Sequence, residues 1–177
     1  MPFELRELLA SVPRNGTVEW IGVRPARRDP LVVVDTVEAR AGRGLTGDRF
    51  QGGATSKRQV TLIQYEHLCV IAHLLGREQI DPALLRRNIV VRGINLLALN
   101  GALFSIGGAV FEGSGACHPC SRMEEAFGAG GYTAVRGHGG ITARVITSGV
   151  IRLGDEVAFQ KRLEPGAKEA VPDSPAE

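Results

Sequence analysis

The sequence predicts a mostly β, barrel-like domain with a few short peripheral helices. Glycine occurs 23 times in 177 residues, which is roughly twice its ordinary frequency. These glycines separate short runs of aliphatic and β-branched residues, the pattern expected for strands joined by tight turns. Segments long enough to show helical periodicity are few. Seven or more short strands with glycine turns favour a barrel.

The first half of the chain alternates short strands with two helices. Residues 3–10, FELRELLA, predict a short helix that ends before Pro13 and the Asn15-Gly16 turn. Residues 65–75 carry apolar side chains at helical spacing and predict a second helix. The strands predicted here are Gly16–Val23, Leu31–Ala39 and Arg58–Ile63, with a hairpin-like loop between the first two and an irregular glycine-rich segment at 42–53.

The second half predicts more strands and two short helices. Asp81 as N-cap with Pro82 at the first position begins a helix over 82–87, and 121–126 predict another that ends at Gly128. The predicted strands are Asn88–Val91, Leu103–Ile106, Ala109–Glu112, Ile141–Thr147, Val150–Leu153 and Glu156–Phe159, with a hairpin around Ser148-Gly149.

The chain divides into three parts by composition. Residues 1–15 are a short helical segment and residues 16–160 form the barrel domain. Residues 161–177 are rich in Pro, Ala and Glu without periodicity, and we expect a mobile tail there.

Composition also restricts the class of protein. A net charge of +2 does not indicate a nucleic-acid partner. No apolar run approaches the ~20 residues of a membrane span, and the N-terminus lacks the apolar core of a signal peptide. We therefore expect a cytoplasmic protein with neither a nucleic-acid nor a membrane partner. Arginine supplies 18 of the 21 basic residues, which fits either compositional bias or an oxyanion ligand.

The cysteines are too few for a disulfide framework. Cys69 lies in an apolar run and is expected in the core. Cys117-His118-Pro119-Cys120 follows a predicted strand and precedes a short helix. Unpaired N–H groups at the start of that helix favour a thiolate at Cys120, and Arg122 adds positive charge. Two small turn residues, a structural zinc site, a thioredoxin-like redox pair and a single reactive thiolate are alternatives for this motif.

Three further clusters combine glycine or a carboxylate with arginine. Glycine lets backbone N–H groups approach a ligand closely, and arginine forks bind oxyanions. The first cluster surrounds the 47–53 loop, the second is Arg86-Arg87-Asn88 and the third is 136–144. The candidate ligand-binding residues from them are Asp48, Arg49, Arg58, Arg87, Arg136, His138, Gly139, Gly140 and Arg144. Asp48 either locks its own turn or positions Arg49.

These motifs together resemble the MOSC domain, which occurs at the C-terminus of molybdenum-cofactor sulfurases and in stand-alone bacterial proteins. The resemblance runs from about Gly16 to Phe159. It rests on GRGLTGDRFQGG at 42–53, KRQVTLIQYEHL at 57–68, RRNIVVRGINL at 86–96, CHPCSRM at 117–123 and RGHGGITARVITSGVIRLGDEV at 136–157.

The resemblance implies a mostly antiparallel barrel of the pyruvate-kinase barrel-like type. It also implies a pterin cofactor with a phosphate and an oxo-molybdenum group. The functional cysteine of the family corresponds to Cys120. In relatives that reduce N-hydroxylated compounds, including the mitochondrial amidoxime-reducing component, this cysteine ligates molybdenum, and in sulfurase-type relatives it is proposed to carry a persulfide.

The sequence departs from these relatives in what accompanies the domain. No pyridoxal-phosphate domain is present, so neither that cofactor nor desulfurase activity is expected. The N-terminal barrel of the mitochondrial reductases and a ferredoxin-like cysteine cluster are also absent, so a separate electron or sulfur donor protein is expected. Cys117 is either a resolving thiol for Cys120 or part of the turn.

Three hypotheses follow for the function. The preferred one is a molybdenum-cofactor-binding protein in which Cys120 is the metal ligand or sulfur carrier, acting on an N-hydroxylated or N-oxide compound. The second is a non-catalytic carrier that delivers sulfur or cofactor to another protein. The third is a β-barrel binding module whose CxxC motif is structural and holds zinc.

Overall fold

The computed structural model describes residues 3–166, and seven of its strands close into a barrel. The strands are β1 (Gly16–Val23), β2 (Val32–Val33), β3 (Thr36–Arg40), β4 (Gly44–Leu45), β5 (Val60–Gln64), β6 (Ile89–Arg92), β7 (Ala102–Ile106), β8 (Ala109–Ala116), β9 (Ile141–Thr147), β10 (Gly149–Arg152) and β11 (Glu156–Arg162). The helices are α1 (Leu5–Ala10), α2 (Tyr65–Leu74), α3 (Arg122–Phe127) and α4 (Gly131–Val135), with 3-10 helices η1 (Pro82–Leu85) and η2 (Leu96–Leu99).

The barrel has the strand order β11-β7-β8-β9-β5-β6-β1, and pairing of β1 with β11 closes it. β2 extends the sheet beyond β1, and β10-β3-β4 form a small second sheet. The predicted mostly β barrel is confirmed, with one difference. β5 and β6 run parallel, because residues 65–88 cross over between them and include α2 and η1.

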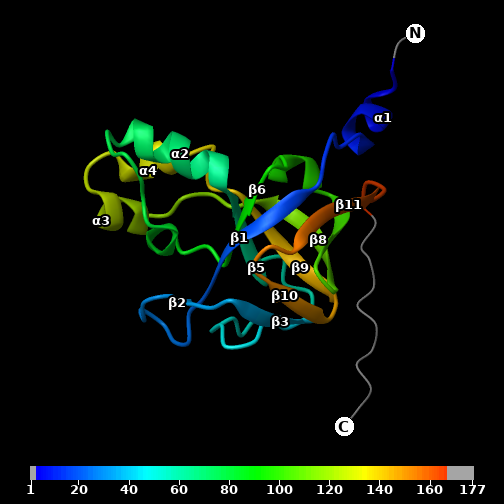
Figure 1. Cartoon of the computed structure of the whole chain (residues 1–177), viewed down its shortest axis with the longest axis horizontal. Coiled ribbons are helices and arrows are strands. Elements are labelled where there is room, and N and C mark those ends of the chain that lie inside the picture. The colour runs from blue at the N-terminus through cyan, green and yellow to red at the C-terminus, as the bar shows by residue number, and fades with distance from the viewer. Residues whose placement is uncertain (1–2, 167–177) are drawn as a thin grey trace.

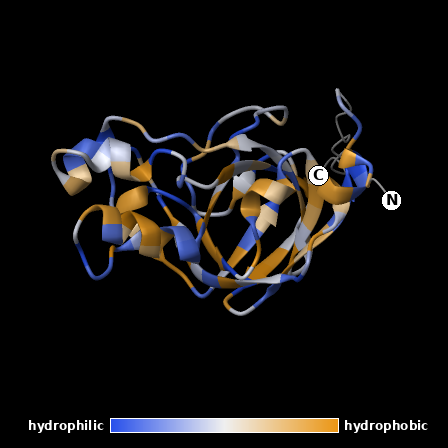
Figure 2. Ribbon diagram, turned by 90° about the horizontal axis from the view of Figure 1, so that it is seen from above, coloured by the Kyte–Doolittle hydropathy of each residue, from blue (hydrophilic) through white to orange (hydrophobic). Residues whose placement is uncertain are grey.

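Two hydrophobic clusters hold this architecture together. The first fills the barrel, where Phe104 and Phe111 stack with ring centroids 5.6 Å apart. The second lies outside the barrel, where Ile63 and Val90 of β5 and β6 pack against residues of α2, α3, α4 and η1. Figure 1 shows these helices gathered on one side of the barrel, and Figure 2 shows hydrophobic residues along the barrel strands and on the helices. The helices thereby brace the segment that carries Cys120.

Several predicted elements differ from the structure. The predicted hairpin of 141–147 with 150–153 is wrong. β8 and β5 occupy both edges of β9, so β10 pairs with β3 instead. The predicted strand Leu31–Ala39 is divided into β2, which pairs with β1, and β3. Helices η2 and α4 were not predicted.

Two predictions concern residues at or near the surface. Cys69 is exposed rather than in the core, because the buried face of α2 is formed by Leu68, Ile71 and Ala72. β11 continues to Arg162, past the predicted domain boundary at 160. Residues 167–177 of the predicted tail lie outside the described part of the chain.

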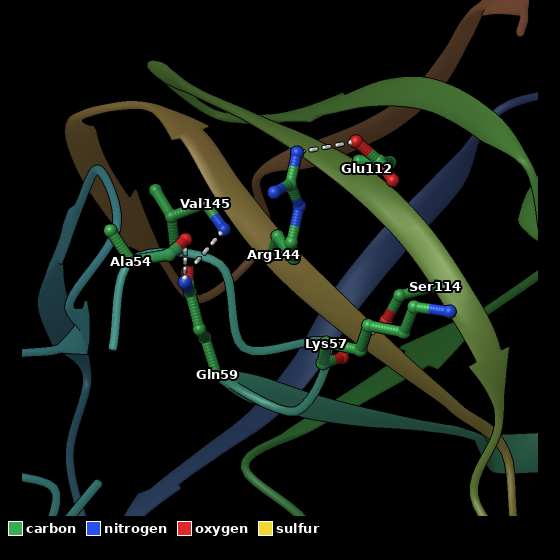
Figure 3. A network of polar contacts seen from close by, with 7 residues as sticks. All are labelled: Ala54, Lys57, Gln59, Glu112, Ser114, Arg144 and Val145. Carbon is green, nitrogen blue, oxygen red and sulfur yellow. Dashed lines mark hydrogen bonds and ion pairs between the residues drawn. The ribbon is translucent and has the colours of Figure 1, made fainter. Parts of the chain in front are cut away.

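A buried ion pair lies on the outer surface of the barrel. Arg144 alternates along β9 with Ala143 and Val145, which belong to the barrel interior. The Arg144 Nη2 group therefore points outward and donates to Glu112 Oε2 on β8 over 2.8 Å (Figure 3). The two side chains are only 6% and 13% exposed. Removing the Glu112 carboxylate takes away a charge-assisted hydrogen bond that has little access to water.

Glu112→Gln is therefore expected to lower the free energy of unfolding by about 2 kcal/mol through loss of this charge-assisted hydrogen bond, measured by urea denaturation. Glu38→Gln is the matched control, because Glu38 pairs with Arg40 at the surface with both side chains about half exposed. It should change stability by less than about 1 kcal/mol. Equal effects in the two variants would contradict the importance of the buried pair.

Candidate functional site

A cavity of about 500 Å³ opens where six segments meet at the barrel rim. They are the end of β1, the loop at Leu31 before β2, the 48–52 loop, the start of β5, the junction of η1 with β6, and the cysteine motif before α3. Its lining includes five arginines and one carboxylate, namely Arg24, Arg49, Arg58, Arg86, Arg87 and Asp48. Cys117, His118 and Cys120 line it as well. The excess of guanidinium groups makes the cavity suited to an anion.

Asp48 fixes the loop on one side of the cavity. Its Oδ1 atom accepts from the Arg24 backbone N–H at 2.9 Å and from Asn88 Nδ2 at 3.2 Å. Its Oδ2 atom accepts from the Phe50 N–H at 3.3 Å, across its own turn. Asn88 also donates to the Gly22 carbonyl and accepts from the Thr61 N–H. Asp48 thereby joins the loop to the end of β1 and the start of β6. These contacts fix the backbone position of the adjacent Arg49.

The rest of the loop is held by the barrel wall (Figure 3). Gln59 Nε2 donates to the Ala54 carbonyl at 2.9 Å, and Gln59 Oε1 accepts from the Val145 N–H at 2.9 Å. Ser114 Oγ donates to the Lys57 carbonyl. These contacts anchor the backbone beside Arg58, while the Arg58 side chain stays exposed at the cavity.

Arg87 is buried in the wall of the cavity, where its guanidinium group joins three segments of the chain. Its Nε donates to the Gly139 carbonyl at 2.7 Å, Nη1 to the Leu85 carbonyl at 2.8 Å and Nη2 to the Cys117 carbonyl at 3.4 Å. The residue is 6% exposed. One guanidinium thus fixes η1, the 137–140 turn and the cysteine motif relative to one another.

The cysteine motif links β8 to α3 and forms part of the cavity wall. The Cys117 N–H donates to the Gly140 carbonyl at 2.8 Å, and the Cys120 carbonyl accepts from the Met123 N–H at 2.9 Å at the start of α3. Both cysteines are free thiols, Cys117 half-buried and Cys120 exposed. Within residues 3–166, no three His, Cys, Asp or Glu side chains group as metal ligands, which gives the structural-zinc alternative no support there.

Arg24 and Arg86 were missed as site residues. Burial lowers the pKa of Arg86 and the Arg122 charge lowers it further, while Cys120 acts in the opposite direction. Burial, followed by the charges of Arg86 and Arg49, lowers the pKa of Arg24. The adjacent arginines at 86 and 87 were a visible signal for Arg86. No sequence motif around Arg24 indicated a ligand site. Arg24 reaches the cavity because β1 ends at its rim.

The 136–144 cluster does not line the cavity. Arg136 is exposed elsewhere, and Arg144 lies in the ion pair with Glu112. Gly139 and Gly140 lie behind the wall, where a Cβ would overlap the carbonyl oxygens of Cys117 and Leu62, respectively. These glycines allow the 137–140 turn to approach β5 and the cysteine motif, so their contribution to the cavity is structural.

His138 faces His67 of α2 on the far side of that turn. The two rings form an edge-to-face contact with centroids 5.2 Å apart. Both Nδ1 atoms are buried, and within residues 3–166 neither has a hydrogen-bond partner. Burial lowers the pKa of His67, and the His138 charge lowers it further. Protonation of His67 is therefore less favourable in the folded protein than in the unfolded chain.

The barrel and its cysteine-bearing arginine cavity define the class of protein. The family model for the MOSC domain matches residues 43–158. The chain belongs to the MOSC domain family, which is generally associated with binding of molybdenum cofactor. Helices capable of crossing a membrane are absent from residues 3–166.

Solved structures show the same fold. The YuaD protein from Bacillus subtilis is 20% identical with a TM-score of 0.71, and the alignment covers 83% of this chain and 98% of that chain. YiiM from Geobacillus stearothermophilus is 19% identical with a TM-score of 0.68, covering 83% and 76%. YiiM from Escherichia coli is 19% identical with a TM-score of 0.66, covering 85% and 72%. A comparison with curated proteins gave no match.

Gly140→Ala is expected to destabilise the protein by at least about 3 kcal/mol, because φ is +84° and the new methyl overlaps the Leu62 carbonyl. Gly137→Ala is the matched control, since it has the same φ but open space around the Cβ position. It should cost about 1 kcal/mol. Thermal unfolding compares the two, and equal losses would contradict the role assigned to close packing.

Stability should fall as the pH is lowered through the ordinary His pKa of about 6.5. The unfolded chain protonates His67 more readily than the folded protein does, so acid favours unfolding, and the loss is complete below the folded pKa. His67→Gln should reduce the dependence of the denaturation midpoint on pH between about pH 7 and pH 5. His73→Gln, an exposed histidine on the same helix, should leave the slope unchanged. A slope insensitive to His67→Gln would contradict this assignment.

Proposed function

We propose that this chain binds molybdenum cofactor in the arginine-lined cavity, with the Cys120 thiolate as a ligand to the metal. The observation that carries the proposal is the exposed Cys120 in a cavity that five arginines line. Its donor set fits the group, because guanidinium forks suit a pterin phosphate and oxo-anion, and a thiolate is a soft ligand for the metal.

The cavity residues have different roles according to their positions. Arg49 and Arg58 extend from the anchored loop at the opening and are exposed, so they are suited to bind the phosphate. Arg24 and Arg86 are partly buried and add positive charge to the cavity, and Arg86 interacts electrostatically with Cys120. Asp48 and Arg87 are positioning residues that hold the loop and the cysteine motif. When bound, the cofactor supplies a redox-active centre for reducing N-hydroxylated or N-oxide compounds, with electrons from a separate donor protein.

A carrier role is the second candidate, and the exposure of Cys120 favours it. An exposed thiolate can attack the outer sulfur of a donor protein's persulfide, which forms a persulfide on Cys120 and releases the donor thiol; an acceptor nucleophile can then take that sulfur and restore the thiol. Cys117 in the same cavity could instead attack the Cys120 sulfur, which would form a Cys117–Cys120 disulfide and release hydrosulfide. The two roles share Cys120 and differ in what it binds.

The test is to express the protein in the cytoplasm of a host that makes molybdenum cofactor and purify it without oxygen. Molybdenum and pterin are then measured per protein, the latter by fluorescence after oxidation. Cys120→Ala should lose most of the metal, whereas Cys117→Ala, which also lines the cavity, should retain it. Equal metal content in the two variants would remove the ligand role.

The arginines are tested by retention of the pterin. Arg49→Gln should weaken cofactor binding about tenfold through loss of a charge-assisted contact, whereas Arg152→Gln, an exposed arginine on β10, should behave like the unchanged protein. A Cys120 persulfide after incubation with a desulfurase, seen as one added sulfur by mass spectrometry without bound molybdenum, would favour the carrier role.

A further inference from the structure

A second cavity of about 480 Å³ adjoins the first. It lies between the 28–31 loop, η1 and α3, and it shares Arg24, Leu31 and Arg86 with the first cavity. These three side chains form the boundary between the two spaces. Both volumes fall within the range of ligand sites in proteins.

The boundary carries a cluster of four guanidinium groups. Arg49 lines the first cavity, Arg122 lines the second, and Arg24 and Arg86 line both. Burial is the largest cause of the lowered pKa of Arg24, and Arg86, Arg49 and Arg122 lower it further; burial likewise lowers the pKa of Arg86 most, followed by Arg122 and Arg49. Mutual repulsion among partly buried cations is relieved when an anion binds between them. Charges that extend from Arg49 to Arg122 match a ligand with more than one anionic group.

The backbone at Arg86 supports this interpretation. Arg86 ends η1 with φ 60° and ψ 36°, a left-handed conformation that a non-glycine residue rarely adopts. The conformation costs free energy and is often found where a side chain must be placed for function. Here it places Arg86 on the boundary of both cavities.

The second cavity differs from the first in its apolar wall. Pro30, Leu31 and Leu84 line it, and Leu84 is 41% exposed. Three carboxylates also line this cavity. Asp81 accepts from the Ala83 N–H and Glu125 pairs with Arg122 at 3.7 Å, while Asp29 is exposed and follows Arg28, which lines the cavity as well. An apolar wall beside arginines suits a planar ring attached to a phosphate.

The geometry points to a ligand with two linked phosphates that lies across Arg24 and Arg86 and places a nucleoside in the second cavity. The inference rests on the proposed function, because it extends the phosphate-bearing ligand of the first cavity into its neighbour. The ligand class is therefore a nucleoside diphosphate group, free or joined to a pterin.

The test uses purified cofactor-free protein titrated calorimetrically with CDP, inorganic diphosphate, inorganic phosphate and cytidine. CDP should bind at least tenfold more tightly than phosphate or cytidine, because it engages both the cations and the apolar wall. Arg122→Gln should weaken CDP about tenfold and leave phosphate unchanged. Arg152→Gln is the charge-matched control and should bind CDP normally.

CDP binding no tighter than that of phosphate, or equal CDP affinity in Arg122→Gln and Arg152→Gln, would overturn the inference. Leu84→Asp provides a second measurement, since it alters only the second cavity and should reduce binding of CDP more than that of diphosphate. If CDP binding fails this test but molybdenum and pterin loading are normal, only the further inference is rejected and the proposed function stands. Normal CDP binding without any loading would reject the proposed function instead.

Discussion

The position of the cysteine motif at 117–120 depends on one buried guanidinium, that of Arg87. Arg87 donates to three main-chain carbonyls, those of Leu85, Gly139 and Cys117, from segments far apart in the sequence. Its charge is offset by carbonyl dipoles, and hydrogen bonds to a charged group contribute about 1.5–3 kcal/mol each. The turn, η1 and the cysteine motif are thereby held together, and the glycine at 139 leaves room for the clamp.

Local patterns predicted much of the fold. The apolar runs Leu103–Ile106 and Ala109–Glu112 predicted two strands, which the structure contains as the antiparallel pair β7–β8. The separation of Gly149–Arg152 from β9 was not predictable, because it depends on which strands occupy the edges of β9. The parallel β5–β6 pair had a signal in the succession of strand, helix and strand over 58–91, which favours a crossover.

Some of the residues suggested as ligand-binding line the cavity and others do not. Asp48, Arg49, Arg58 and the two cysteines line one cavity. The glycines at 139 and 140 do not, because close approach of two backbones requires the same residue type as close approach to a ligand. Arg24 carried no local signal, since only the barrel topology brings the end of β1 to this rim.

Closure of the barrel has a consequence for folding kinetics. Gly16 and Thr17 of β1 pair with Val157 and Glu156 of β11, which lie at the opposite end of the domain sequence. Such distant pairing carries a large loop-closure entropy and slows the search for the native topology. During synthesis, β1 leaves the ribosome long before its partner, so its free edge is open to wrong pairing until the last strand arrives.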